Sequence, residues 1–398
     1  MSVNWESIRE EEYPSIKKHN LTYFLSAGAS LMNRNAYEIG IEYFNQMYKY
    51  GDINHERFFI ELENVRNLIA EYINTDSEEI AFLVNTSSGI AATAYMFKND
   101  KGEILYPSIE FPASIHMFNR LGFTCTKIMD TNGMYPIESF NNYVSNATKY
   151  IVHSHVQSFN GFRQDLKELG IFCRKNNLIN IVNSTQAFGV FEINMQEFNI
   201  DVLISNALKW LGCGYGIGIL SIKKKLSEKY QLPFTGWLSV DDPFAMDNEN
   251  LNIIQKTRSM DSLGGCPNFA SLLTLKGGLS LIKQKIGGGN MQSGIKKIQE
   301  RIINLTSEFL EMINDFNFKI ITPEDEKYRS GIITVEHIKA KKIHRYLTKH
   351  NIYTTLKTYP KAPKETLIRF AINFYNNSTD IERVKDILNS CQYIKKKI

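Results

Sequence analysis

The sequence predicts an α/β fold with a mostly parallel sheet, helices on both of its faces, and a smaller C-terminal α+β domain. From about residue 60 to residue 225, short apolar runs alternate with stretches of helical periodicity. This rhythm is typical of a parallel sheet, because the crossover helices cover both faces. After about residue 265, two long helical stretches come first and two short strand-like runs follow. We therefore expect an N-terminal segment (1–22), a large domain (23–265) and a small domain (266–398).

The individual elements follow from composition and spacing. β-branched apolar runs bounded by polar residues predict strands at EIAFLV (79–84), YIVHSHV (150–156), INIV (179–182), DVLIS (201–205) and IGILSI (217–222). Apolar residues at helical spacing predict helices at SSGIAATAYMF (87–97) and QDLKELGIFCRKNN (164–177). In the small domain, the same criteria predict helices over 269–286 and 293–316 and strands at GIITVEH and LIRFAINF.

Composition excludes several classes of protein. The 398 residues carry a net charge of only +4, which is too small and too evenly spread for nucleic-acid binding. No apolar run approaches the roughly 18 residues of a membrane span. The five cysteines are scattered without a CxxC pair, and the N-terminus reads as polar, so we expect a cytoplasmic protein. His153 and His155 alternate on a strand without other metal-type residues nearby, so we interpret both as structural and expect no metal.

Polar side chains follow four of the predicted strands. Asn85 to Gly89 follow the first strand, Gln157 and Ser158 the second, Asn183 to Gln186 the third, and Asn206 and Lys209 the fourth. In open α/β sheets, ligands bind just beyond the carboxyl ends of the strands. Hydroxyls, amides and one amine are therefore expected at one edge of the sheet.

Two of these features have alternative readings. Thr86, Ser87 and Ser88 either cap a helix or form a phosphate site with the free N–H groups of its first turn. Lys209 is either a surface cation beside a turn or a nucleophile. Together, a phosphate site, a lysine amine and amides are what pyridoxal 5'-phosphate (PLP) requires, because the lysine links covalently to its aldehyde. The glycines that follow Lys209 lead into a strand rather than a helix, so they do not form a dinucleotide loop.

Four stretches carry a resemblance to a known family: SHVQSFNGFRQDL (154–166), NSTQAFGVFEIN (183–194), LKWLGCGYGIGIL (208–220) and GGCPNF (264–269). In these stretches, and from YFLSAGAS to RFAINFYNN, the chain resembles the class V aminotransferases. These are fold-type I PLP enzymes that include cysteine desulfurases, selenocysteine lyases and isopenicillin N epimerase. The resemblance implies a PLP cofactor and a homodimer with shared active sites.

The resemblance also implies roles for individual residues. Lys209 is expected to bind the cofactor covalently, Ser87 and Ser88 its phosphate, Phe111 its ring face and Gln186 its phenolic oxygen. Arg369 is expected to bind the substrate carboxylate, because a guanidinium can donate two parallel hydrogen bonds to it, and Gly28 and Ala29 are also expected to bind the substrate. The remaining residues expected at the cofactor are Ser158, Asn183, Asn206 and, from the neighbouring subunit's GGCPN loop, Cys266.

This chain departs from the family pattern at several of these positions. Asn183 stands where Asp is usual, so it supplies no charge to the pyridine nitrogen, and the ring is expected to be a weaker electron sink. Leu208 stands in place of His, Asn206 in place of Ser or Thr, and Cys266 in place of Thr. The stretch IYTTLKTYPKAPKETLI before Arg369 contains no cysteine, so the persulfide-forming nucleophile of true desulfurases is expected to be missing.

Three functions remain open at this point. The first is a PLP enzyme acting at the amino group or Cα of a small amino acid or amino-acid-derived metabolite, by lyase, epimerase or transamination chemistry. The second is a catalytically decayed scaffold or binding module, and the third is a pocket that binds another ligand. Joint retention of Ser87, Gln186, Lys209 and Arg369 favours the first.

Overall fold

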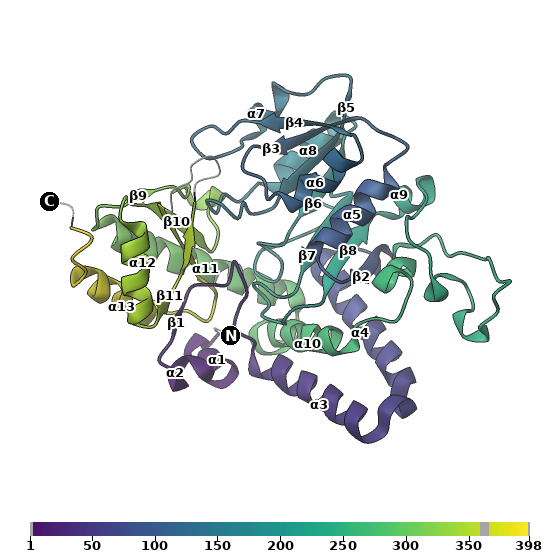
Figure 1. The fold of residues 1–398 in the computed structure, drawn as a ribbon, viewed down its shortest axis with the longest axis horizontal. Coiled ribbons are helices and arrows are strands. Elements are labelled where there is room, and N and C mark those ends of the chain that lie inside the picture. The colour runs from purple at the N-terminus through teal and green to yellow at the C-terminus, as the bar shows by residue number, and fades with distance from the viewer. Residues whose placement is uncertain (1–2, 359–365, 397–398) are drawn as a thin grey trace.

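The computed structural model describes residues 3–358 and 366–396, and its centre is a seven-stranded sheet (Figure 1). The strands lie in the order β2, β8, β7, β6, β5, β3, β4. Only β8 is antiparallel to its neighbours, so the predicted mostly parallel sheet is confirmed. The strands are Ile80–Leu83 (β2), Glu103–Pro107 (β3), Thr124–Ile128 (β4), Thr148–Ser154 (β5), Ile179–Asn183 (β6), Val202–Asn206 (β7) and Gly218–Ile222 (β8).

Helices cover both faces of this sheet because its strands are apolar on both sides. Phe82 and Leu203 pack in one core cluster with the helices α4 and α10, whereas their neighbours Ala81 and Ile204 pack in another with α5 and α6. No helix among residues 3–358 and 366–396 has both the length and the apolar character needed to cross a membrane. The helices of this region are Arg34–Tyr50 (α3), His55–Ile73 (α4), Thr86–Met96 (α5), Ala113–Arg120 (α6), Ile137–Asn141 (α7), Leu166–Lys175 (α8), Lys224–Lys229 (α9) and Phe269–Ser280 (α10).

The C-terminal part forms a four-stranded antiparallel sheet in the order β12, β13, β10, β9. Its apolar face, which includes Ile368 and Phe370, packs in one cluster with side chains of three helices. The elements are Met291–Asn314 (α11), Lys319–Ile320 (β9), Ile332–Glu336 (β10), Ala340–Lys349 (α12), Thr355–Lys357 (β12), Leu367–Ala371 (β13) and Ser378–Asn389 (α13). The small α+β unit predicted from the sequence is therefore present.

The packing does not divide the chain sharply at residue 265. Leu272 and Leu275 of α10 belong to the same core cluster as the large sheet, and this cluster continues to Ile303 in α11. Within α11, the cluster of the small sheet begins at Leu305. The division at residues 265 and 266 stays a prediction, and the apolar packing favours a boundary inside α11.

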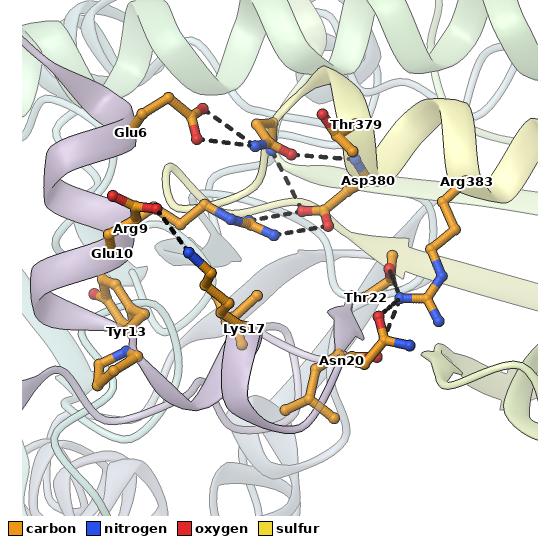
Figure 2. Close-up of a pocket in the computed structure, with 14 residues that line it drawn as sticks. Glu6, Arg9, Glu10, Tyr13, Lys17, Asn20, Thr22, Thr379, Asp380 and Arg383 are labelled. Atoms are coloured by element: carbon orange, nitrogen blue, oxygen red, sulfur yellow. Dashed lines mark hydrogen bonds and ion pairs between the residues drawn. The ribbon is translucent and has the colours of Figure 1, made fainter.

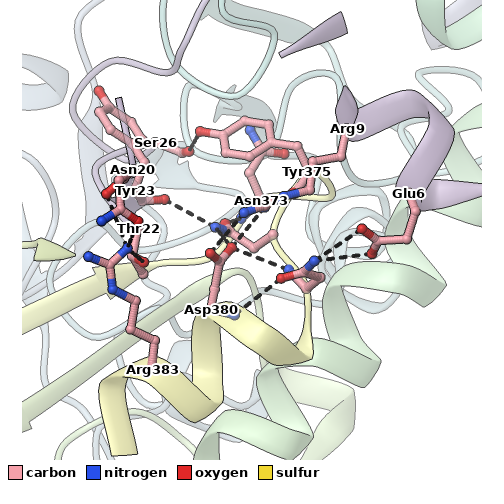
Figure 3. Close-up of polar contacts among 12 residues, drawn as sticks. Glu6, Arg9, Asn20, Thr22, Tyr23, Ser26, Asn373, Tyr375, Asp380 and Arg383 are labelled. Atoms are coloured by element: carbon pink, nitrogen blue, oxygen red, sulfur yellow. Dashed lines mark hydrogen bonds and ion pairs between the residues drawn. The ribbon is translucent and has the colours of Figure 1, made fainter. Parts of the chain in front are cut away.

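The N-terminal segment is bound to the C-terminal part of the chain. Arg9 of α1 (Trp5–Glu12) donates to both carboxylate oxygens of Asp380, at 2.8 and 2.9 Å (Figure 2). After α2 (Ser15–Lys18), the strand β1 (Thr22–Tyr23) pairs in parallel with β11 (Ile352–Tyr353). Figure 3 shows that the hydroxyl of Tyr375 reaches Ser26, 2.9 Å away, which extends the contact towards the large domain. A cavity of about 590 Å³ lies between α1, α2 and α13.

A buried ion pair fixes the edge of the large sheet. Arg66 of α4 donates to Asp261 over 2.5 Å and to the carbonyl of Ile80, and Asp261 also accepts from the backbone N–H of Phe82. The side chains of Arg66 and Asp261 are 1% and 9% exposed. The pair therefore connects α4, strand β2 and the segment that leads into Gly264 and Cys266.

We expect Asp261→Asn to lower the free energy of unfolding by about 3 to 5 kcal/mol, because it leaves the Arg66 charge buried without its main partner. Urea unfolding monitored by circular dichroism measures this change. The matched control is Glu228→Gln, which removes the exposed pair with Lys224 and should leave stability nearly unchanged. Equal effects of the two substitutions would contradict the role given to Asp261.

Candidate active site

A cavity of about 330 Å³ lies at the carboxyl ends of β5, β6 and β7. Ser154, Asn183 and Asn206 are the last residues of these three strands, and all three line the cavity. The start of α5 closes another side through Thr86 and Ser87. Among the described residues that line this cavity, none is Asp or Glu. The strand ends named in the sequence analysis thus meet at one site, as expected for parallel strands.

Lys209 lies in the loop after β7 and points its amine towards this cavity. Its Nζ lies 5.8 Å from the centre of the Phe111 ring. Gly212 holds the loop in place: its φ is +63°, and a Cβ there would lie 2.1 Å from the Leu31 carbonyl oxygen. Burial, together with the charge of Arg369, lowers the pKa of Lys209 to about 7. A large share of this amine is therefore neutral near pH 7, which is the form that attacks a carbonyl.

The first turn of α5 offers free donors. Asn85 caps the helix by accepting from the N–H of Ser88 at 2.9 Å, while the Ser88 hydroxyl bonds back to the Asn85 backbone. Ser88 is thus used in the cap and does not line the cavity, and its expected role at the cofactor stays a prediction. The N–H groups of Thr86 and Ser87 bind no acceptor in the described part of the chain. Together with the helix dipole, they form an anion site.

Asn206 lies beside this anion site. Its Nδ2 donates to the Thr86 hydroxyl at 2.9 Å, and that hydroxyl lies 2.9 Å from the hydroxyl of Thr185. The Oδ1 of Asn206 is buried and has no hydrogen-bond partner. A buried polar atom of this kind marks a place that a bound molecule or water completes.

Asn183 is fixed by two neighbours. Its Nδ2 donates to the Ser114 hydroxyl at 2.9 Å, and its Oδ1 accepts from the backbone N–H of Thr185 at 3.1 Å. Ser114 in turn donates to the carboxylate of Glu110 at 2.9 Å. Because a serine hydroxyl has a single proton, Ser114 must accept from Asn183, and this sets the orientation of the amide. One N–H and one lone pair of Asn183 remain for a ligand.

Glu110 is a buried acid that the sequence analysis did not single out. Its two oxygens also accept from the N–H groups of Phe111 and Ser154, the Ser154 hydroxyl, and the Nε2 of Gln157. Backbone and amide N–H groups are obligate donors, so the Glu110 oxygens act as acceptors in these contacts. The Glu110 carboxyl is thus linked to Asn183 through the Ser114 hydroxyl.

Gln186 is held by its neighbours as well. Its Nε2 donates to the carbonyl of Ala27 at 3.0 Å, and its Oε1 accepts from the indole N–H of Trp210 at 3.1 Å. The second Nε2 proton remains available to a ligand in the cavity that Gln186 lines. This geometry is compatible with the predicted bond from Gln186 to a phenolic oxygen.

Arg369 reaches the site through Ser158. Its Nη1 donates to the Ser158 carbonyl at 2.9 Å, and Ser158 lines the cavity. Lys357, which the sequence analysis did not name, donates to the same oxygen at 3.2 Å. Burial lowers the pKa of Arg369 to about 10. Arg369 and Lys357 therefore meet at the Ser158 end of the site.

The remaining predicted residues lie outside the cavity lining. Gly28 and Ala29 follow Ala27, and their backbone groups bond to Leu25 and Tyr23. Cys266 is exposed, and its expected role requires a second subunit. The roles given to these three residues stay predictions.

His153 and His155 are 0% and 4% exposed. His153 bonds to Asn180, and burial lowers its pKa to about 4. Burial and the charge of Arg163 also lower the pKa of His155. Both histidines are therefore neutral interior groups. Within residues 3–358 and 366–396, no three His, Cys, Asp or Glu side chains are grouped so that they could hold a metal ion.

The fold and this site define a class of PLP-type enzyme, and comparison with known proteins gives the family. The family model described as "Aminotransferase class-V" matches residues 22–384. The chain therefore belongs to the class V aminotransferase family, whose enzymes use PLP.

Individual relatives are distant. An uncharacterized aminotransferase, YcbU, of Bacillus subtilis is 20% identical over 94% of this chain and 95% of its own. A probable cysteine desulfurase of Borreliella burgdorferi is 25% identical over 91% of this chain and 89% of its own. Among solved structures, an apo cysteine desulfurase from Thermococcus onnurineus superposes with a TM-score of 0.86 at 18% identity, with 98% of each chain covered. A C-DES mutant with glycine covalently linked to its PLP cofactor gives a TM-score of 0.80 at 16% identity, over 95% of this chain and 98% of its own. The similarity to these two solved structures shows that the chain shares their fold.

We expect Asn183→Asp to destabilise the cofactor-free protein more at pH 8 than at pH 5. Ser114 cannot donate to two carboxylates at once, so the introduced carboxyl, next to Glu110, takes up protons more readily in the folded than in the unfolded state. Stability relative to the parent protein is therefore lost as pH rises, by about 1.4 kcal/mol for each unit by which the pKa is raised.

Urea unfolding at the two pH values measures the difference. Asn183→Leu is the matched control, because it removes the amide without adding a charge and should show no such pH dependence. If Asn183→Asp loses the same stability at both pH values, Glu110 does not act on residue 183.

Proposed function

We propose that this protein is a PLP-dependent enzyme that acts at the amino group or Cα of a small amino acid or amino-acid-derived metabolite. The observation that carries the proposal is the Lys209 amine, which has a lowered pKa and lies in one cavity with a free helix N-terminus, Asn183 and Gln186. The reaction class stays within lyase, epimerase or transamination chemistry.

The residues present fit the cofactor. The N–H groups of Thr86 and Ser87 suit its phosphate, and the half-exposed ring of Phe111 suits its ring face. Asn183 and Gln186 each retain a polar group for the ring nitrogen and the phenolic oxygen. When bound, PLP supplies an electron-withdrawing ring that stabilises negative charge at a substrate Cα. Because Asn183 is neutral, the nearest fixed negative charge in this network is that of Glu110, behind Ser114.

The chain's own groups have separate tasks in such a reaction. Arg369 orients the substrate through its carboxylate, at the Ser158 end of the cavity. Lys209 Nζ is the base at the cavity, since its pKa near 7 allows it to accept and return a proton at neutral pH. Leu208, which also lines the cavity, adds apolar surface beside the amine and offers no proton.

We also propose that the chain does not use the persulfide chemistry of cysteine desulfurases. No cysteine occurs between Ile352 and Ile368, although residues 359–365 of this stretch lie outside the described residues. None of the five cysteines lines the cavity. The free thiols also favour a cytoplasmic location, because a reducing compartment keeps cysteines unpaired.

We expect purified protein to take up added PLP and to gain a visible absorption band, because the Lys209 amine is neutral enough to react. Borohydride should then fix the cofactor to the peptide that contains Lys209, with a yield that rises with pH around pH 7. Mass spectrometry locates the modified peptide.

Lys209→Ala should abolish both the band and the fixation. Lys319→Ala, which changes an exposed lysine of the small sheet, is the control and should change neither. A protein that stays colourless with PLP and is not modified by borohydride would favour the alternatives of a decayed scaffold or another ligand.

A homodimer with shared sites is part of the same proposal. The helix α3 exposes Tyr37, Ile41, Phe44 and Tyr48, although a monomer gains nothing from apolar side chains in water. A second exposed apolar group, Phe244, Met246 and Leu251, lies in the loop that projects from the large domain (Figure 1). Near the cavity, Tyr215 lines the site and is itself 75% exposed. A partner that covers these surfaces would bring a Cys266 loop close to each site.

We expect light scattering at micromolar concentration to give about twice the chain mass of 45.8 kDa. Phe44→Glu should shift the protein towards monomer, because it places a charge in the covered apolar surface. Ile338→Glu, at a residue that is 79% exposed on the small domain, is the control and should not. A monomer that still binds PLP would overturn the shared-site arrangement.

A further inference from the structure

Two cationic side chains meet at one backbone carbonyl beside the candidate active site. The Ser158 oxygen accepts from Nη1 of Arg369 at 2.9 Å and from Nζ of Lys357 at 3.2 Å. The two nitrogens can therefore be no farther apart than the sum of these distances. Ser158 lines the cavity, whereas Arg369 and Lys357 contact its carbonyl from outside the lining.

The strand register explains why they share this position. Thr355 of β12 pairs with Arg369 of β13, and Lys357 lies two residues along from Thr355, so all three side chains leave the sheet on the same face. Arg369 also pairs with Thr334 of β10, whose hydroxyl donates to the carbonyl of Phe159 at 2.8 Å. The polar face of the small sheet thus lies against the Ser158–Phe159 backbone.

These cations have no acidic counterpart. Within the described residues, neither Lys357 nor Arg369 has a carboxylate at ion-pair distance, and the Nε of the 5% exposed Arg369 has no hydrogen-bond partner. Burial, followed by the charges of Arg369 and Lys209, lowers the pKa of Lys357 to about 7. Arg369 is buried and Lys357 half-buried, and cations withdrawn from water without a counter-charge cost free energy that a bound anion offsets.

A purely structural role does not account for the pair. One carbonyl oxygen has two lone pairs, whereas a lysine and an arginine carry three and five N–H donors. Most of these donors remain unused at Ser158. A single arginine can bind one carboxylate on its own, because two of its N–H groups donate in parallel to the two oxygens. The lysine therefore remains available for a second anion.

We propose that Lys357 binds a second acidic group of the substrate, so that the enzyme acts on amino acids with an acidic side chain. Arg369 then takes the α-carboxylate, and Lys357 takes the carboxylate or similar anion of the side chain. This inference rests on the proposed function for the amino-acid part of the ligand. The recognition of a second anion is tested independently of any reaction.

Succinate and butyrate are suitable probes, because both are four-carbon acids without an amino group and differ by one carboxylate. Calorimetric titration of the PLP-loaded protein should show succinate binding at least about tenfold more tightly than butyrate, a difference of about 1.4 kcal/mol. Lys357→Met should remove this preference by weakening succinate alone, whereas Arg369→Met should weaken both acids. Lys357→Arg should retain the preference, and Lys319→Met, which changes an exposed lysine of the same small sheet, should have no effect.

Equal affinities of the unmodified protein for the two acids would overturn the inference, and so would a preference that survives in Lys357→Met. The first of these outcomes needs no variant, so the inference stays testable if Lys357→Met does not fold. Loading with PLP is checked by absorbance before each titration. A protein that fails to load contradicts the proposed function, whereas one that loads but does not prefer succinate contradicts only the role of Lys357.

Discussion

The whole site depends on one geometric constraint, namely that neighbouring parallel strands end at the same edge of the sheet. The residues Ser154, Asn183 and Asn206 are far apart in sequence, yet each is the last residue of a strand in the run β5, β6, β7. Backbone hydrogen bonds of the ladder fix their spacing, so no side chain has to hold the others in place. Side chains at these positions can therefore be exchanged without loss of the fold.

The electrostatic character of the site follows from the side chains that line the cavity and from two cations that contact Ser158 from behind it. The large domain contributes amides, hydroxyls and one amine, and the small domain contributes two cations through Ser158. The acid closest to Asn183 through hydrogen bonds, Glu110, lies behind Ser114 and does not line the cavity. A pocket with this charge pattern attracts anions at both ends and leaves the lysine between them with a lowered pKa.

The sequence allowed the fold and the centre of the site to be predicted because both depend on local patterns. Apolar runs marked the strands, and the residues directly after them marked the edge at which Lys209, Asn183 and Gln186 meet. Ser88 was ambiguous, because a helix cap and a phosphate site use the same residue types; the structure shows its bonds to Asn85 in the cap. Glu110, Ser114 and Lys357 could not be found in this way, since their importance comes from contacts across the fold. For Lys357, the alternation in TTLK was the single available signal. It predicted on which face of a strand the lysine lies, but not which residues pack against that face.

The attachment of the N-terminal segment has a consequence for how the chain folds. Arg9 precedes its partner Asp380 by 371 residues, and β1 precedes β11 by a similarly long stretch that includes the whole large sheet. Contacts of such large sequence separation form late, because the long intervening chain must be closed first. All seven strands of the large sheet precede β11 and Asp380 along the chain. Docking of the N-terminal segment through Arg9 and β1 is thus expected to be one of the last steps of folding.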